Sequence, residues 1–365
     1  LLELLESLAR QLADLPVLIV TTYRRAEDGL SDWPASIDEV LTLHLPLVPL
    51  GAGEARELAV TAAGRTLPEA VLANIEVRAG GNPLFVTELA RLAASHPDAA
   101  EPPELPGTLR ALIASRLDEL TPSQRALLDN AAILGGEGRV VALREFAAEL
   151  GQPFEPDDLD AIAASTLMVV DGGHWQFRSD LVREVAYQTL TKQARAQRHA
   201  GVARHLQQFG DALLDLRAHH AASTAELVAE IGSVPGVPAD IGEQAAQLLV
   251  RSARRWHVQG AHRRAVEVTE RAVDLAADGD THREAVLLLA EGLVETHALA
   301  RAREVLDEAA ELAAAAGDRT MGAVVWQLRG TVAQMEGDLV TARRELGRAV
   351  GELRELGDRA HLAEA

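Results

Sequence analysis

A short apolar run at residues 17–20 is followed at once by Thr21, Thr22 and Arg24. A continuous apolar run of this length is typical of a buried parallel strand, and open α/β sheets bind ligands beyond the carboxyl ends of their strands. A guanidinium placed there forms charge-assisted hydrogen bonds with phosphate and is always ionised. Thr22 and Arg24 are therefore candidate phosphate-sensing residues. Arg25 is an alternative sensor, and an ordinary strand exit with a solvent-facing arginine is the simpler interpretation.

The second constellation is Gly81-Asn82-Pro83, which separates two segments with helical patterns. Gly80 and Gly81 suit the end of the first helix, and Pro83 suits the first turn of the next. The N-terminus of a helix presents backbone N–H groups that can bind an anion. The helix start at Asn82 and Pro83 is therefore a candidate anion site, although a plain helix cap would use the same residue types.

The remaining polar residues offer little recognisable chemistry. The chain has no cysteine, which excludes disulfides and cysteine-based metal sites. His219-His220, His257 and His262 lack the spacing with carboxylates on one short helix that a metal site needs. Serine, histidine and aspartate form no arrangement that supports a nucleophile. We therefore expect no metal site and name no catalytic residue.

The composition of the 365 residues bounds the class of protein. A chain of this length suggests two or three domains, and 48% apolar residues suffice for buried cores. Aromatic residues make up only 3%, so Leu, Ala and Val must build these cores, and such a composition favours helix. The formal net charge of −20 argues against a general nucleic-acid surface, which needs clustered Lys and Arg. No apolar run reaches the length of about 18 residues that suggests a membrane span, so we expect a cytoplasmic protein without a membrane partner.

Turn-forming residues divide the chain into segments. Four prolines between residues 96 and 106 mark the clearest linker. Helical patterns follow, and then two alternating segments flank Asp171-Gly172-Gly173, which is a strong hairpin signal. Helices followed by a hairpin predict a winged-helix domain. Residues 105–190 carry seven arginines and no lysine against thirteen acidic residues, so we expect no direct DNA binding by this domain.

The last third of the chain repeats itself. Residues 301–319 align with residues 341–359 at an offset of 40, and residues 264–280 align less well at an offset of 37 to 38. Gly-Asp stands at the turns, and the pattern resembles tetratricopeptide repeats, whose basic period is about 34 residues. Such helix pairs bury their faces only by stacking, and they present a concave binding surface.

Three strings carry a resemblance to STAND-type AAA+ ATPases, in which a nucleotide switch is joined to a helical-repeat sensor. They are Thr21-Thr22-Tyr23-Arg24, the run RAGGNPLFVTEL at 78–89, and Phe177-Arg178-Ser179, where the family usually has Phe-Arg-His. The resemblance implies that Arg24 reports the γ-phosphate and that Pro83 packs against the adenine. Because Ser179 replaces the family histidine, a role as a helix N-cap is the better interpretation of this residue.

The resemblance also implies a fold class and a domain order. The fold would be mainly α, with a remnant of an α/β P-loop domain, a helical lid, a winged-helix domain and an α-helical solenoid of tetratricopeptide-like repeats. The expected ranges are 1–50 for the end of the P-loop domain, 51–95 for the lid, 96–106 for the Pro-rich linker, 107–192 for the winged helix and 193–365 for the repeats.

For function, the resemblance implies a slow regulatory ATPase. ATP or ADP with Mg²⁺ would set its state, a protein or small-molecule inducer would bind the repeats, and the output would be cyclic-nucleotide synthesis or transcription. A nucleotide-dependent oligomer is compatible with the family.

The motifs that bind phosphate and Mg²⁺ in this family do not precede these strings. There is no Gly-x-x-x-x-Gly-Lys-Ser/Thr loop and no apolar strand ending in Asp-Asp or Asp-Glu. We therefore expect the C-terminal part of a longer protein, inactive on its own. Two alternatives stay open: a non-enzymatic helical-repeat scaffold with a vestigial ATPase half, and a cyclase whose catalytic domain lies upstream.

Overall fold

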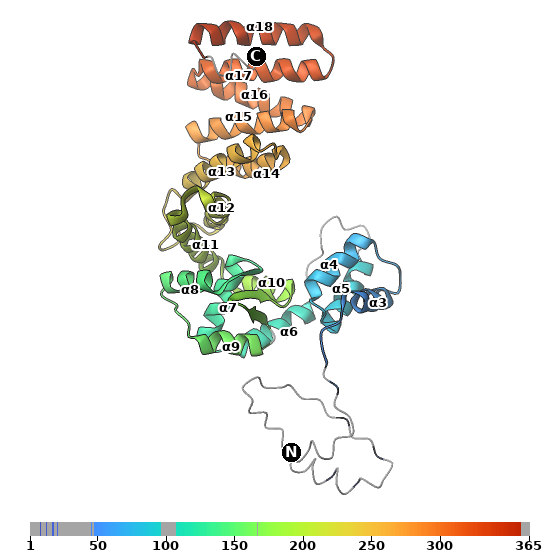
Figure 1. Cartoon of the computed structure of the whole chain (residues 1–365). Coiled ribbons are helices and arrows are strands. Elements are labelled where there is room, and N and C mark those ends of the chain that lie inside the picture. Colours follow the sequence, from blue (N-terminus) through green and yellow to red (C-terminus); the bar gives the residue numbers. More distant parts are fainter. Residues whose placement is uncertain are drawn as a thin grey trace. The chain divides into compact units, whose positions relative to one another are not determined.

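The computed structural model describes residues 47–95, 107–165 and 167–358, together with Leu8, Leu12, Val17, Val20 and Leu45. The described chain is mainly helical (Figure 1), as its Ala- and Leu-rich composition predicts. Its contacts divide it into two compact units, Leu1–Thr189 and Leu190–Ala365. Most of the expected P-loop remnant and the whole linker at 96–106 lie outside the described residues.

Three helices open the described part of the first unit: α3 Ala52–Ala63, α4 Glu69–Ala79 and α5 Pro83–Ser95 (Figure 1). α3 ends at Gly64 and α4 ends at Gly80, both with left-handed backbone that glycine adopts without strain. Ala55 of α3 and Phe85 of α5 are both buried in one apolar core. Small residues on α3 thus leave room for the larger side chains of α5.

The rest of the first unit combines helices with one small antiparallel sheet of strand order β1-β3-β2. A capping box at Thr121 and a first-turn proline at Pro122 fix the start of its helix α7. In chain order the elements are α6 Gly107–Asp118, α7 Pro122–Leu134, β1 Glu137–Arg139, α8 Val140–Glu149, α9 Pro156–Ala164, β2 Met168–Asp171, β3 His174–Phe177 and α10 Asp180–Thr189.

The predicted hairpin is confirmed by the pairing of β2 with β3. Asp171 pairs with His174, and Gly172 and Gly173 have φ of 54° and 81°, as a two-residue type I′ turn requires. β1 was not predicted, because three residues centred on Gly138 have no strand pattern of their own. Trp175 of β3 is 1% exposed, and a Cβ at Gly138 would lie 2.9 Å from its indole. Glycine therefore lets β1 cover the buried Trp175.

The second unit is almost entirely helical through its described residues. A turn-rich connection with two prolines at 233–238 separates α12 from α13, and the short 3₁₀ segment η1 separates α11 from α12. In chain order the elements are α11 Lys192–Leu206, η1 Gln207–Leu213, α12 Leu214–Ile231, α13 Ile241–Val258, α14 His262–Leu275, α15 Asp280–Glu295, α16 Leu299–Ala316, α17 Arg319–Met335 and α18 Leu339–Leu356.

Gly-Asp pairs join successive helices of this unit. Gly317 ends α16 with φ 66°, and the Asp318 carboxylate caps α17 by accepting the Met321 N–H at 2.9 Å. Asp338 caps α18 in the same way, by accepting the Thr341 N–H at 3.0 Å. α16 and α18 begin 40 residues apart and end 40 residues apart, which confirms the predicted repeat. Each helix packs on the next, and α13, α15 and α17 also contact one another in turn (Figure 1).

Candidate functional site

The Gly-Asn-Pro turn closes the start of α5 on itself. The Asn82 side-chain Oδ1 accepts the Leu84 N–H at 3.0 Å and the Phe85 N–H at 3.4 Å. The Asn82 carbonyl accepts the Val86 N–H at 3.0 Å, and Pro83 has no N–H to offer. Asn82 is therefore the helix cap that its residue type allows.

This capping bears on the nucleotide hypothesis. A helix N-terminus binds an anion through free N–H groups, and at this turn those of Leu84, Phe85 and Val86 already have acceptors. Pro83 is exposed and Leu84 is 47% exposed, so the turn presents an apolar surface. The N–H groups of Leu84, Phe85 and Val86 are therefore not free to bind a phosphate group. Nucleotide contact by Asn82 and Pro83 stays a prediction.

The other two candidate site residues, Thr22 and Arg24, lie outside the described residues, together with Thr21 and Arg25. Their proximity to Asn82 and Pro83 is therefore a sequence-based expectation. Within the described chain, the backbone just before α3 does reach the turn, because the Leu50 N–H donates to the Gly81 carbonyl at 2.8 Å. A Cβ at Gly81 would lie 2.7 Å from the Leu50 carbonyl oxygen. Glycine at 81 is thus required by this close approach.

The preceding residues form a junction between α4 and the start of α10. The Ser179 hydroxyl donates to the Arg78 carbonyl and accepts the Leu181 N–H at 3.1 Å. Ser179 is 4% exposed, and this contact with Leu181 confirms its predicted role as a helix cap. Arg78 Nη2 also pairs with Glu184 Oε2 at 2.9 Å. We refer to Arg78, Gly80, Ser179 and Glu184 as the α4–α10 junction.

Gly80 makes this junction possible. Its φ is 54°, and a Cβ built there would lie 2.0 Å from the Arg178 carbonyl oxygen. No side chain fits at that distance without moving the backbone. The sequence gives no sign that residues about a hundred positions apart meet here, although both belong to motif strings that carry the family resemblance.

A buried histidine pair lies between α11 and α12. His199 Nδ1 and His220 Nδ1 are 2.8 Å apart, so one ring donates a hydrogen bond and the other accepts it. Burial lowers the pKa of His199 to about 3 and lowers the pKa of His220 as well, with neighbouring histidines contributing. Both rings are therefore neutral near pH 7. Among the described residues, no group of three His, Cys, Asp or Glu side chains is placed to hold a metal ion.

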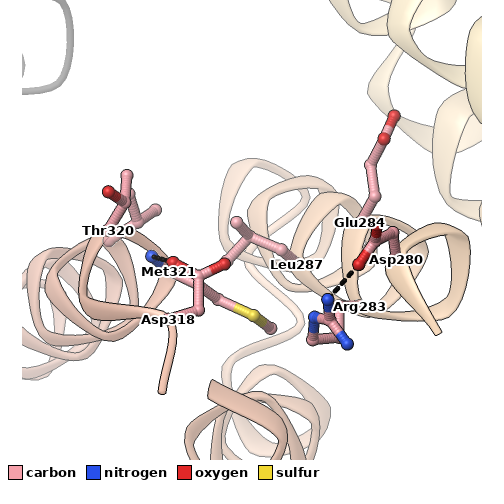
Figure 2. Close-up of a pocket in the computed structure, with 8 residues that line it drawn as sticks. Asp280, Arg283, Glu284, Leu287, Asp318, Thr320 and Met321 are labelled. Atoms are coloured by element: carbon pink, nitrogen blue, oxygen red, sulfur yellow. Dashed lines mark hydrogen bonds and ion pairs between the residues drawn. The ribbon is translucent and has the colours of Figure 1, made fainter. Parts of the chain in front are cut away.

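A hollow of about 280 Å³ lies between the N-terminal parts of α15 and α17. Figure 2 shows Leu287 and the Met321 thioether between the two helices, with Asp280 and Arg283 on one side and Asp318 and Thr320 on the other. Met321 and Val324 are 5% and 3% exposed, so the floor is apolar and well packed. The sequence predicted a concave surface on the repeats but not these lining residues.

The rim of this hollow is charged. Asp280 pairs with Arg283, and Glu284 pairs with Arg254 of α13 at 2.9 Å. The Asp318 carboxylate accepts a backbone N–H, and in the described part of the chain no Lys or Arg pairs with it. The lining contains three carboxylates and one guanidinium, so its formal charge is negative.

Comparisons with known proteins give little further help. No protein-family model and no curated protein matches the chain. One solved structure that aligns is a signal transduction ATPase with numerous domains (STAND) protein with a tetratricopeptide repeat sensor, from Pyrococcus horikoshii. The alignment covers 86% of this chain and 49% of that one, with 15% identity and a TM-score of 0.33. This chain spans about half the length of that protein, and the overlap is too loose to establish a common fold. Within the described residues, no helix is both long and apolar enough to cross a membrane.

Proposed function

We propose that this chain is the lid, transmission and sensor part of a STAND-type nucleotide-switched signalling protein. One observation carries the proposal: a three-helix group bearing the Gly-Asn-Pro turn is followed by a mixed helix and sheet group, and then by stacked helix pairs. This is the order that the sequence motifs imply. The tetratricopeptide-like repeats would bind a protein or small-molecule inducer, and they would bias the switch through different affinities for its two states.

The element order of the middle group supports a winged-helix assignment. Helix α7 is followed by β1, helices α8 and α9, and the hairpin of β2 and β3, with β3 central in the sheet. The excess of acidic residues in this region disfavours a phosphate backbone. We therefore assign it to transmission between lid and sensor, with α10 attached to the lid through the α4–α10 junction.

ATP or ADP with Mg²⁺ would supply the signal, since the γ-phosphate is the feature that differs between the two states. In this chain, Pro83 and Leu84 offer apolar surface to a base ring. Recognition of the phosphate would fall to Thr22 and Arg24, because the N–H groups at the start of α5 are already bonded to Asn82. Output through cyclic-nucleotide synthesis or transcription, and nucleotide-dependent oligomers, belong to the same proposal.

The test is nucleotide retention by the natively expressed protein. ADP that copurifies, and that is lost in Arg24→Gln but retained in Arg25→Gln, would support the switch and identify the sensor. A natively expressed protein that retains no nucleotide and binds none when it is added would sink the proposal. The chain would then be a helical-repeat scaffold with a vestigial ATPase half. The coding sequence upstream of Leu1 gives an independent check through the presence or absence of a phosphate loop.

A further inference from the structure

We propose that the hollow between α15 and α17 binds a peptide segment in which a basic side chain adjoins an apolar one. The proposal rests on the assignment of the repeats as the partner-binding surface and adds the chemistry of the partner. It is drawn from the apolar floor of the hollow and from the Asp318 carboxylate at its rim, which has no Lys or Arg partner among the described residues.

One wall belongs to α15, and its two lining carboxylates are each paired with an arginine. Asp280, Glu284 and Glu291 recur at intervals of four and seven residues, which places them on one face of the helix with Leu287 between them. Asp280, Glu284 and Leu287 line the hollow directly. The face therefore presents carboxylates on both sides of an apolar step.

The facing wall belongs to α17 and carries no cation toward the hollow. It contributes Asp318 at its start, followed by Thr320, Met321 and Val324. The two arginines of α17 turn to other helices, since Arg319 pairs with Glu355 of α18 at 2.9 Å and Arg329 pairs with Asp307 of α16. Neither guanidinium pairs with Asp318.

The lining carboxylate without a Lys or Arg partner among the described residues is Asp318, at the start of α17. Asp280 and Glu284 have arginine partners, whereas the Asp318 carboxylate has only its capping N–H among the described residues. An acidic ligand would be repelled here. An arginine or lysine side chain can lay its methylene groups on Met321 and Leu287 and place its charged end near Asp318. An adjoining apolar side chain would cover the rest of the floor.

The experiment uses the whole chain and a short fluorescein-labelled peptide of alternating arginine and leucine, followed by fluorescence anisotropy. Two matched peptides replace arginine by glutamate or leucine by serine. We expect saturable binding of the Arg–Leu peptide that weakens as salt is added, with much weaker binding of both matched peptides. Absence of Arg–Leu binding, or equal binding of either matched peptide, would overturn the proposal.

Substitutions then locate the site. Asp318→Asn removes the charge but keeps a good helix cap, and we expect it to weaken Arg–Leu binding about three- to fivefold, the upper range for one exposed ion pair. Asp338→Asn is the matched control, because Asp338 caps α18 in an equivalent Gly-Asp turn and does not line the hollow. Equal effects of the two substitutions would refute the assignment.

This result is separable from the nucleotide switch. Peptide binding with no nucleotide retention would leave the ligand chemistry standing and remove the ATPase proposal. Nucleotide retention with no specific peptide binding would support the nucleotide switch and overturn the proposed peptide site.

Discussion

Gly80 is the position at which one added methyl group should do most to open the α4–α10 junction. The change is Gly80→Ala. An alanine there must hold a φ of 54° and place its Cβ 2.0 Å from the Arg178 carbonyl oxygen, far inside van der Waals contact. The side chain cannot turn away, because Cβ is fixed by the backbone. Either α4 or the start of α10 must therefore move.

The expected loss of stability in Gly80→Ala has two contributions, and the control substitution Gly64→Ala carries only the first of them. Left-handed backbone costs a non-glycine residue about 1–2 kcal/mol, and overpacking in a well-packed region costs about 1–3 kcal/mol more. Gly64 at the end of α3 has a φ of 65° with no atom within 4 Å of a built Cβ, so Gly64→Ala carries the first term alone. We expect the free energy of unfolding to fall by about 1–2 kcal/mol in Gly64→Ala and by about 2–5 kcal/mol in Gly80→Ala.

Hydrogen exchange followed by mass spectrometry is the appropriate assay, because it reports each unit separately. Gly80→Ala should lower the protection of amides in α4 and α10 and leave α16 to α18 unchanged. Ser179→Ala is the milder companion if Gly80→Ala does not fold, since it removes one cap and one contact with Arg78. If Gly80→Ala lowers the amide protection of α4 and α10 no more than Gly64→Ala does, the close contact with the Arg178 carbonyl does not limit stability.

Three further predictions concern pairs and caps. Arg78→Met and Glu184→Gln should show a coupling of about 0.5–1 kcal/mol in a double-mutant cycle on α10 protection, because this ion pair is only partly exposed; additive effects would contradict it. His199 and His220 are neutral in the folded protein, because burial lowers their pKa values, whereas in the unfolded chain they protonate near pH 6.5. The stability of α11 and α12 should therefore be complete above pH 6.5 and decline as the pH falls toward 3. At pH 5 we expect the free energy of unfolding to be lower by about 2 kcal/mol per histidine. A pH-independent free energy of exchange in α11 and α12 would refute this. Asp318→Ala should destabilise α17 by about 1 kcal/mol in the same assay and Asp318→Asn by much less, because only alanine loses the cap.

The parts of the fold that local chemistry determines were predictable from the sequence. α7 spans Pro122–Leu134, and its bounds follow from local residue types, since Thr121 and Pro122 specify its start and Gly135 its end. The turn of the hairpin was likewise visible in Asp171-Gly172-Gly173. The repeat is visible in the sequence because residues 301–319 align with residues 341–359, and its Gly-Asp turns combine a left-handed glycine with a capping aspartate.

The parts that depend on distant residues were not predictable in this way. β1 exists because Glu137 to Arg139 find β3 as a partner, and nothing local marks that choice. The close approach of Gly80 to the Arg178 carbonyl and the pairing of His199 with His220 likewise depend on how helices meet. The hollow combines residues of two helices about forty positions apart. A repeat period places such helices side by side but does not say which side chains meet.

The hydrogen bonds at the start of α5 distinguish among the candidate nucleotide-binding residues. At the sequence level, the start of α5 was a candidate anion site and Arg24 a candidate sensor. Asn82 accepts the N–H groups of Leu84 and Phe85, so these two groups are not free for an anion, and Pro83 beside them is exposed and apolar. A base ring gains modest, weakly directional contact from such a surface, whereas a γ-phosphate needs charged or N–H donors. In the proposed switch, discrimination between ATP and ADP would depend on Arg24, so the substitution at Arg24 tests the switch more directly than any change at Pro83.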